Sequence, residues 1–233
     1  MARFGAADLH VETKPDLTPV SDADRDVEQV IRDRLAELRP DDVVLGEEFG
    51  GPAAATRRWI IDPIDGTKSY IRGMPTWATL IALTIEDRGV LGVVAAPALG
   101  RRWWAARGAG AFADGRPIHV SAVSELADSV LAWSGIEDWD ELGRFPVLLE
   151  LGRRCWRTRG IGDAWQYMLV AEGVAEIAVD PVVSLWDLAA PQVIVEEAGG
   201  RFTDFAGVAT ADGGAGLATN GLVHDAALAI LGR

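Results

Sequence analysis

The segment that most constrains how this chain folds is residues 59–67, which read Trp-Ile-Ile-Asp-Pro-Ile-Asp-Gly-Thr. Its first three residues are apolar and bounded by turn formers, which predicts a short buried strand. The strand ends in two carboxylates three residues apart, Asp62 and Asp65, and we expect both to reach one edge of a sheet. Hard divalent cations bind carboxylate and carbonyl oxygens. This edge can therefore offer a cation the two side chains together with the backbone carbonyl of Ile64.

The next two residues, Gly66 and Thr67, add a possible anion site. Gly66 allows positive φ or close approach of the backbone. A helix that begins here would direct its free N–H groups toward the same place, which suits a phosphate. Taken alone, an Asp-x-x-Asp-Gly pattern favours an ordinary turn with solvated acids, so its interpretation depends on the rest of the chain.

Other acidic residues occur at positions that could converge on the same site. Glu47 follows a second short apolar run and precedes Asp62 by fifteen residues. Asp187 opens a helical pattern, where the helix dipole favours an acid. Asp24 lies three residues after Ser21, which is the spacing of a capping box. Taken alone, Asp187 and Asp24 therefore each have a structural explanation.

The composition limits which functions are compatible with the chain. With 22 basic and 35 acidic side chains the net charge is −13, so no nucleic-acid partner is expected. The single cysteine, Cys155, excludes a disulfide framework and a thiolate metal cluster. The three histidines lack the spacing of a zinc site. No apolar run reaches ~18 residues and no signal-peptide pattern opens the sequence, so we expect no membrane partner and a cytoplasmic location.

Apolar periodicity and turn signals predict alternating helices and strands. Residues 22–38 carry apolar side chains at helical spacing, with Ser21 as the N-cap and Arg39-Pro40 as the end. Asp114-Gly115 is a strong hairpin signal. Strands are further predicted at residues 43–45, 59–61, 76–85, 90–96, 103–106, 176–179, 201–205 and 217–219, and helices at residues 140–151, 163–172, 184–198 and after His224.

The order of these elements predicts how the chain is organised. Strands dominate the first part, and helices alternate with strands in the second. This order indicates layered α and β structure in two lobes, residues 1–123 and 124–233, with a seam near residues 120–130. Because glycine and proline do not cluster at the seam, we expect the lobes to pack tightly.

Together these motifs resemble the inositol monophosphatase family. Its signatures are G-E-E, then W-I-x-D-P-[IL]-D-G-T, and near the C-terminus W-D-x-A-A followed by E-A-G-G. All of them occur here in order, at residues 46–48, 59–67 and 186–200, and the resemblance covers essentially the whole chain. It implies the layered αβαβα sugar-phosphatase fold, of the α+β class. It also implies a Mg²⁺-dependent phosphomonoesterase that acts through metal-activated water.

The resemblance assigns metal ligands residue by residue. Glu47, Asp62 and the Ile64 carbonyl would hold a first Mg²⁺. Asp62, Asp65 and Asp187 would hold a second, and a weaker third ion would lie by Glu47. Two to three ions per site are therefore implied, with Glu47 also taking part in activating the water.

Further roles follow from the same resemblance. Asp24 closes the family's P-V-T-x-x-D segment, in which Ser21 here replaces the usual threonine. Asp24 would pair with the Thr67 hydroxyl to orient the attacking water, and Gly66 and Thr67 would contact the substrate. Lys14 either adds a positive charge for the substrate or is an ordinary solvated lysine.

Two features depart from the family pattern. The chain begins where family members have already formed a long N-terminal helix, so either the sequence is shortened or its start is atypical. Pro191 follows Asp187 by four residues, where a regular helix would place its ring against the Asp187 carbonyl. We expect a kink there, or a helix that effectively starts later.

The metal site is shared across the family and does not distinguish substrates. After D-P-I-D-G-T the chain continues Lys68-Ser69-Tyr70, where inositol-type members usually have T-N-F. This segment, residues 14–20 and residues 103–108 resemble the histidinol-phosphate branch. Histidinol phosphate is therefore the predicted substrate. Inositol 1-phosphate, or a broad range of sugar and nucleotide monophosphates, is the alternative.

Two acids support a cationic substrate. Asp163 stands where inositol-type members have the serine of G-S-A, and Asp180 stands where they have a glutamate seven residues before the W-D aspartate. In the family both positions face the part of the substrate that is not phosphate, and acids there suit an ammonium and an imidazole. Alternatively, Asp163 is only a helix N-cap and Asp180 only a turn residue.

Two further expectations concern assembly and catalytic competence. The family resemblance implies a homodimer, and the nine tryptophans leave room for an aromatic interface. Alternatively, the tryptophan-rich run 133–139 lines the substrate entrance. A non-catalytic homologue, kept as a structural or regulatory dimer, is the alternative from another class of protein. A broken set of metal ligands would reveal it, and the set is complete in this sequence.

Overall fold

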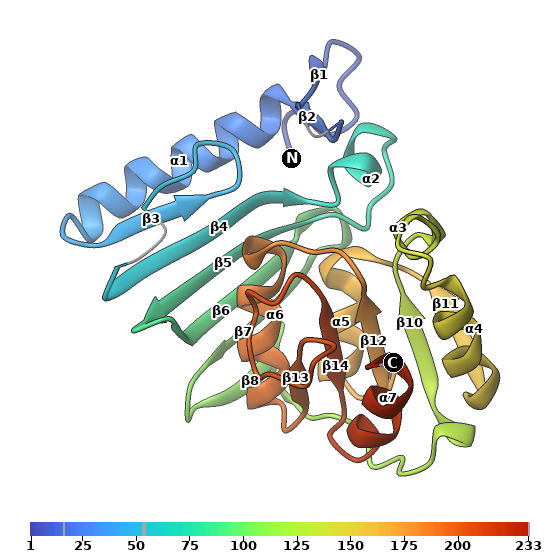
Figure 1. The fold of residues 1–233 in the computed structure, drawn as a ribbon. Coiled ribbons are helices and arrows are strands. Elements are labelled where there is room, and N and C mark those ends of the chain that lie inside the picture. Colours follow the sequence, from blue (N-terminus) through green and yellow to red (C-terminus); the bar gives the residue numbers. More distant parts are fainter. Residues whose placement is uncertain (16, 53–54, 233) are drawn as a thin grey trace.

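Two large β-sheets alternate with three layers of helices over the residues that the computed structural model describes, 1–15, 17–52 and 55–232 (Figure 1). One outer layer is α1 (Asp22–Leu38), the middle layer is α5 (Asp163–Ala171) with α6 (Leu185–Glu197), and the other outer layer is α4 (Phe145–Arg154) with α7 (His224–Leu231). This order of layers confirms the αβαβα fold expected from the sequence.

The first sheet has seven strands in chain order. The first two strands are parallel, and every later neighbour is antiparallel. Asp114 and Gly115 have φ of 50° and 80° and form the two-residue hairpin turn that the sequence predicts. The strands are β3 (Val43–Gly46), β4 (Arg57–Asp65), β5 (Ala78–Ile85), β6 (Arg88–Ala96), β7 (Arg101–Ala106), β8 (Gly110–Ala113) and β9 (Arg116–Ile118).

The second sheet has five strands in the order β11-β10-β12-β14-β13. β10 is parallel to both of its neighbours, whereas β14 is antiparallel to both of its own. The strands are β10 (Val130–Trp133), β11 (Arg157–Gly160), β12 (Ile177–Asp180), β13 (Arg201–Thr203) and β14 (Gly216–Thr219). The sequence analysis missed β10 and β11.

Short elements complete the fold. β1 (Val11–Thr13) and β2 (Pro19–Ser21) form an antiparallel pair just before α1. The helices α2 (Thr67–Ile71) and α3 (Ile136–Glu141) each follow directly after a strand end, and two 3₁₀ turns span Pro97–Leu99 and Leu126–Asp128. As described below, α2 and α3 both border the candidate site.

The main core lies between the two sheets, around α6. Val193 and Ile194 of α6 are fully buried in one cluster with Leu80 from the first sheet and Phe202 from the second. Burying each such side chain contributes about 1.5–3 kcal/mol relative to leaving it exposed. Gly92 on β6 lets the helix approach closely, because a side chain there would press into the α6 backbone. The core therefore fixes the start of α6 relative to the first sheet.

Two expected elements have different limits. The single helix expected at residues 140–151 is wrong, because Gly143 adopts φ of 64° and Pro146 occupies the first turn of a new helix, α4. The strand expected at residues 59–61 is longer and continues through Asp65 as β4.

Pro191 lies inside α6, which begins at Leu185. The expectation that the helix starts later is therefore wrong, and the kink stays a prediction. The first sheet precedes the predicted seam in sequence and the second sheet follows it, but both sheets share the core around α6. The division into two lobes at residue 123 therefore also stays a prediction. Within the described ranges, no helix is long and apolar enough to span a membrane.

Candidate active site

A β-bulge in β4 brings Asp62 and Asp65 to the same side of the sheet. Residues three apart on a regular strand face opposite sides, because side chains alternate. Here Asp62 pairs with Leu80 and Asp65 pairs with Ala78, so three steps on β4 match two steps on β5. The extra residue restores a common face. The chain between the two acids is thus a bulged strand, where the sequence suggested a turn.

Glu47 reaches the site because β3 runs parallel to β4 and ends opposite Ile61, one residue before Asp62. Gly46, the last residue of β3, is paired with Ile61, and the Glu47 N–H donates to the Ile61 carbonyl at 3.1 Å. Glu47 therefore leaves β3 beside Asp62, which lies inside β4 one residue after Ile61. Fifteen residues separate these acids in sequence, and the sheet places them side by side.

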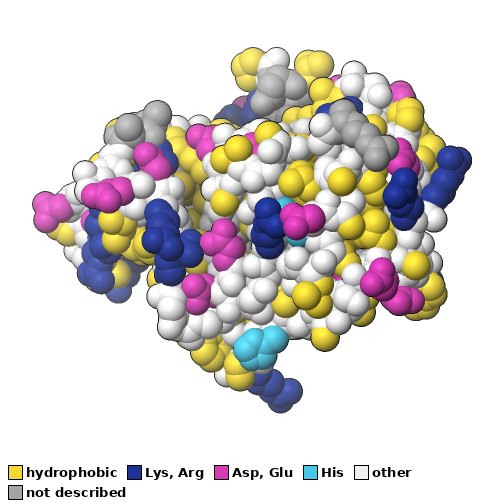
Figure 2. Space-filling view, turned by 60° about the horizontal axis from the view of Figure 1, so that its bottom comes forward, with side chains coloured by type: hydrophobic (Ala, Val, Ile, Leu, Met, Phe, Trp, Pro, Cys, Tyr) yellow, Lys and Arg dark blue, Asp and Glu magenta, His cyan; other side chains and the backbone are white. Residues whose placement is uncertain are grey.

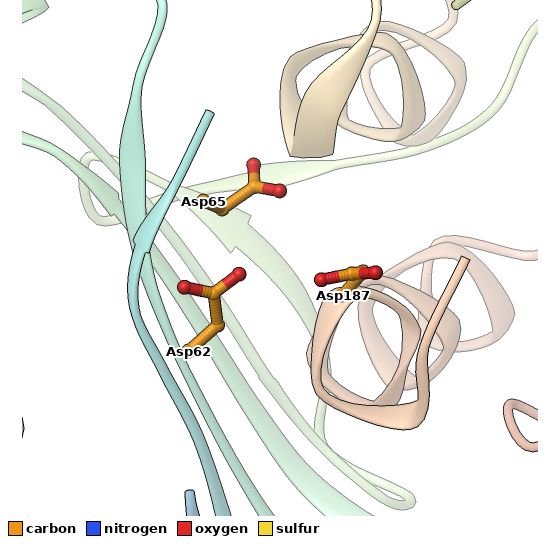
Figure 3. Close-up of side chains that lie close together, drawn as sticks. All are labelled: Asp62, Asp65 and Asp187. Atoms are coloured by element: carbon orange, nitrogen blue, oxygen red, sulfur yellow. The ribbon is translucent and has the colours of Figure 1, made fainter. Parts of the chain in front are cut away.

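Asp187 enters from the other side of the site, on the first turn of α6. Its Oδ2 accepts the Ser184 N–H at 2.7 Å, so the carboxylate also caps the helix. Figure 3 shows Asp62, Asp65 and Asp187 pointing into one common space between β4 and α6. One oxygen of each carboxylate lies within 4.8 Å of the others.

The electrostatics of this cluster favour a cation. Burial raises the pKa of Asp62 well above its usual value, and the charges of Glu47 and Asp65 raise it further. Burial likewise raises the pKa of Asp65, with contributions from Asp163 and Asp187. For Asp187, burial outweighs the hydrogen bond from Ser184 and brings the pKa to about 6. Carboxylates that repel one another this strongly are stabilised when a cation neutralises them.

The donor set fits a hard divalent ion. Asp62 is 1% exposed, and its Oδ1 is buried without a hydrogen-bond partner among the described residues. A buried carboxylate oxygen without a partner is costly unless something else binds it. All the converging side chains offer oxygen, which is the ligand that Mg²⁺, Ca²⁺ and Mn²⁺ prefer.

A second group of contacts links Thr67 to Asp24. The Thr67 Oγ1 lies 3.0 Å from Asp24 Oδ1 and 2.9 Å from the Ile64 carbonyl. The other oxygen of Asp24 accepts the backbone N–H and the hydroxyl of Ser21, at 2.8 and 2.6 Å. The pairing of Asp24 with Thr67 that the resemblance implies is therefore present, and so is the capping contact with Ser21.

The start of α5 holds Asp65 in place, a contact that the sequence analysis missed. The Ala164 N–H donates to Asp65 Oδ2 at 2.6 Å. Asp163 has φ of 52° and is the first residue of α5, with Gly162 as the N-cap, so the expectation that Asp163 is only an N-cap is wrong. No sequence signal connects these segments, which are ninety-nine residues apart.

The predicted site residues surround one cavity of about 260 Å³. Of the eleven predicted residues, nine line it: Glu47, Asp62, Ile64, Asp65, Gly66, Thr67, Asp163, Asp180 and Asp187. Asp24 lies behind Thr67 and Lys14 lies behind Glu47, so neither lines the cavity. Gly66 adopts φ of 81°, and a side chain there would press against the Asp163 carboxylate.

Lys14 is bound to two acids beside the cavity. Its Nζ donates to Glu47 Oε1 at 2.8 Å and to Glu48 Oε1 at 2.6 Å. Burial lowers the pKa of Lys14, but the hydrogen bonds to Glu47 and Glu48 outweigh it and raise the pKa above its usual value. The alternative of a solvated lysine is therefore wrong, and a direct contact with substrate stays a prediction.

Asp163 and Asp180 both lie in the cavity wall, and neither belongs to the group of three converging aspartates. Burial raises the pKa of Asp163 to about 6 and the pKa of Asp180 to about 7. Asp180 is the last residue of β12 and accepts hydrogen bonds from the Tyr167 hydroxyl, at 2.5 Å, and from Gln166. It is a buried strand residue, so the expectation of a mere turn residue is wrong.

Other cavity residues were not predicted. Ser134 and Asp138 follow β10, Tyr167 is on α5, and Lys68 is on α2. Ser134 and Asp138 fall in the run 133–139, the alternative lining of the substrate entrance, but the sequence analysis did not name them because it missed β10. The signal was the apolar run of residues 130–133 followed by Ser134-Gly135, which is typical of a strand end.

Comparison with known proteins agrees with this geometry. The model of the inositol monophosphatase family matches residues 1–231. A histidinol-phosphatase of Mycobacterium tuberculosis is 54% identical over 232 residues, which cover 97% of this chain and 89% of that protein. A histidinol-phosphatase of Streptomyces coelicolor is 51% identical over 242 residues, which cover 100% of this chain and 91% of that protein.

Solved structures show the same fold. The extragenic suppressor protein suhB of Bartonella henselae superposes with a TM-score of 0.92 at 30% identity, over 100% of this chain and 92% of that one. The Thermotoga maritima IMPase superposes with a TM-score of 0.89 at 32% identity, over 99% of this chain and 89% of that one. The resemblance carried by the sequence motifs is confirmed, and this protein belongs to the inositol monophosphatase family.

Proposed function

We propose that this protein is a Mg²⁺-dependent phosphomonoesterase whose substrate is histidinol phosphate. The observation that supports the metal dependence is the convergence of Asp62, Asp65 and Asp187, with a buried Asp62 oxygen that lacks a partner among the described residues. Glu47, Asp62 and the Ile64 carbonyl would hold one ion. Asp62, Asp65 and Asp187 would hold another, and a third would lie by Glu47.

Bound Mg²⁺ would supply positive charge to the phosphoryl oxygens and leaving group and would lower the pKa of water. The chain's own residues supply orientation and a path for the proton. When the Thr67 hydroxyl donates its hydrogen bond to Asp24 rather than to the Ile64 carbonyl, the lone pairs of Thr67 Oγ1 can accept a hydrogen bond from a water molecule. Two contacts from Ser21 hold Asp24 in this position. No nucleophile from the protein is needed.

The charge balance of the cavity supports a cationic leaving group. Seven acids line the described cavity wall, whereas Lys68 is its single lysine or arginine. Four of the acids belong to the proposed metal site. Asp138, Asp163 and Asp180 remain, and a buried negative charge is stabilised by an ammonium or imidazolium group. The names of the two relatives at 54% and 51% identity point to the same substrate.

The test is phosphate release from a panel of monoesters with Mg²⁺. We expect kcat/KM for histidinol phosphate to exceed that for inositol 1-phosphate by at least ~10-fold, a difference of ~1.4 kcal/mol in transition-state binding. Equal values would favour the alternative of a broad monophosphatase. Release of phosphate from none of the esters would favour the non-catalytic alternative.

Metal removal tests the other half of the proposal. Exhaustive chelation should abolish turnover, and Mg²⁺ should restore it. Ca²⁺ should suppress it, because Ca²⁺ prefers more ligands and a looser geometry. By resemblance to the family, Li⁺ should inhibit as well. Full activity after chelation would contradict the metal mechanism.

The assembly is proposed on family resemblance. We expect a homodimer in the cytoplasm, so light scattering should give about twice the chain mass of 24.9 kDa. Exposed apolar side chains such as Trp156, which is 67% exposed, could lie in such an interface. A mass of one chain at micromolar concentration would contradict the dimer.

A further inference from the structure

Glu28 is a buried acid on α1 that makes no direct contribution to the cavity. Its side chain is 0% exposed. The carboxylate accepts hydrogen bonds from the backbone N–H groups of Glu48, at 2.8 Å, and Phe49, at 3.3 Å. It also accepts a hydrogen bond from Arg32 Nε at 2.7 Å. A charge buried this deeply is tolerated only where such donors compensate it. The position of Glu28 is therefore tied to the backbone of the segment that follows β3.

That segment, residues 46–50, is a closed loop that carries Glu47. Gly46 and Gly50 exchange two backbone hydrogen bonds of 3.0 Å, so the loop begins and ends at one point. Arg32 donates to the Gly50 carbonyl as well as to Glu28. The loop is thus held at its closing point by Arg32 and at its middle by Glu28, and both side chains come from α1.

Gly46 shows how closely helix and loop approach. A side chain at this position would overlap the Glu28 carboxylate, so the fit requires glycine. The Gly46 backbone does not adopt positive φ, and the requirement is therefore one of space. This contact explains the glycine of the Gly-Glu-Glu motif without reference to a ligand.

We propose that Glu28, assisted by Arg32, is a positioning residue that holds the Glu47 loop in the geometry that binds metal. The inference rests on the proposed function, in which Glu47 is a metal ligand. Residues that orient a ligand by hydrogen bonds typically change metal affinity 10- to 100-fold when they are replaced. In this protein the held group is a loop backbone, and Glu47 follows because its carboxylate extends from that loop.

The test is the Mg²⁺ dissociation constant of E28Q, measured by calorimetric titration of the whole chain. Glutamine keeps the size of Glu28, but it has one acceptor oxygen, and its amide would face a donor. We expect the dissociation constant to rise about 10-fold or more. Turnover should recover as Mg²⁺ is raised, because Glu28 does not touch the substrate.

A matched control is E176Q. Glu176 is also a buried glutamate, and it accepts the Val130 N–H at 2.7 Å and the Ser121 hydroxyl at 2.8 Å. It holds backbone in the same manner, at Val130, the first residue of β10. Glu176 directly precedes β12, whereas the cavity residue Asp180 ends that strand. We expect E176Q to lower the melting temperature and to leave the Mg²⁺ dissociation constant within about 2-fold of wild type.

The outcomes separate the inference from the proposed function. Wild-type protein that binds no Mg²⁺ would overturn the proposed function. Wild-type binding with an unchanged constant in E28Q would overturn the positioning role alone, whatever happens to the melting temperature. If E28Q does not fold, R32K decides, because lysine lacks the second nitrogen with which the Arg32 fork reaches the Gly50 carbonyl as well as Glu28. A weaker constant in R32K supports the role, and an unchanged one overturns it.

Discussion

Asp24 and Asp187 show how one carboxylate can cap a helix and also face the candidate site. Each is the third residue of its helix and accepts a hydrogen bond from the N-cap residue, Ser21 or Ser184. The cap occupies one oxygen and fixes the rotamer of the side chain. The remaining oxygen of Asp24 lies by Thr67, and the Asp187 carboxylate faces Asp62 and Asp65. A capping bond of this kind contributes about 1 kcal/mol.

Replacing Asp62 with Asn tests the proposed metal site at one of its three converging aspartates. We expect kcat/KM to fall by well over ~10-fold, because the carboxylate is proposed to bridge two ions. Without metal, D62N should melt no lower than wild type, since one of several repelling charges has been removed. If D62N keeps more than about a tenth of the wild-type kcat/KM, Asp62 is not a metal ligand.

Replacing Asp163 or Asp180 with Asn tests whether the negative charge of these two side chains is needed to bind a cationic leaving group. Asn tolerates the positive φ of Asp163, and it preserves the shape of Asp180 beside Tyr167. We expect kcat/KM for histidinol phosphate to fall ~10-fold or more in each variant, as for the loss of a charge-assisted hydrogen bond. A neutral monoester should be nearly unaffected. Equal losses on both substrates would mean that the two acids are structural.

At the scale of elements, α7 is attached to the second sheet through its first residue. His224 is fully buried, and its two ring nitrogens lie 3.1 Å from the Thr203 hydroxyl and 3.0 Å from the Thr219 hydroxyl. These threonines belong to β13 and β14. Burial, together with the nearby positive charge of Arg201, lowers the pKa of His224 to about 4. The ring is therefore neutral in the fold.

This histidine predicts a loss of stability in acid. Between about pH 6.5 and 4 the unfolded chain binds a proton that the folded chain does not, so the free energy of unfolding falls as the pH falls. A shift of this size corresponds to roughly 3 kcal/mol. Urea denaturation of wild type and H224Q measures it, because the difference between the two cancels the contribution of the site carboxylates. A difference that does not change with pH would contradict the buried neutral ring.

At the scale of the whole molecule, charge is the dominant feature. The net charge is −13, and several of the acids converge on one cavity. On the face drawn in Figure 2, basic side chains lie in small groups beside acidic ones. In the described part of the cavity wall, basic side chains beside the carboxylates are few. Lys14 donates to Glu47 from behind the wall, and Lys68 lies in the wall itself. The repulsion among these carboxylates opposes folding when no cation is bound.

Mg²⁺ should therefore stabilise the fold measurably. The pKa of Asp187 is raised from 3.8 to about 6 in the fold. The metal-free fold therefore loses stability as the pH rises from 3.8 to about 6, because in this window the folded chain holds a proton that the unfolded chain has released. At pH 7.5, free Mg²⁺ at ~100 times its dissociation constant adds about 2.7 kcal/mol. For a chain of this size the melting temperature should rise by roughly 5–10 °C.

The control for this shift is NaCl at matched ionic strength, which screens the general negative charge without binding the site. D62N should lose most of the Mg²⁺-dependent rise in melting temperature. A rise that NaCl reproduces in full would mean that these carboxylates do not form a metal site.

Local interactions explain what could be predicted from sequence. The helix at residues 22–38 with its Ser21 cap, the Asp114-Gly115 turn and the acidic ends of apolar runs each depend on neighbours a few residues away. The family motifs are likewise contiguous in sequence. These features determined the fold class and nine residues that line the cavity.

The tertiary structure alone decided how distant segments meet. Four sets of contacts join segments that are far apart in sequence. They are the pairing of β10 with β11 and β12, the hydrogen bond from the Ala164 N–H to Asp65, the hydrogen bond from Lys14 to Glu47, and the contacts between Glu28 and the Glu47 loop. Their energy depends on burial and on hydrogen bonds that exist only after the sheets and helices have packed. A linear pattern can therefore identify the acids of this site, but the packed layers determine which backbone groups and charges surround them.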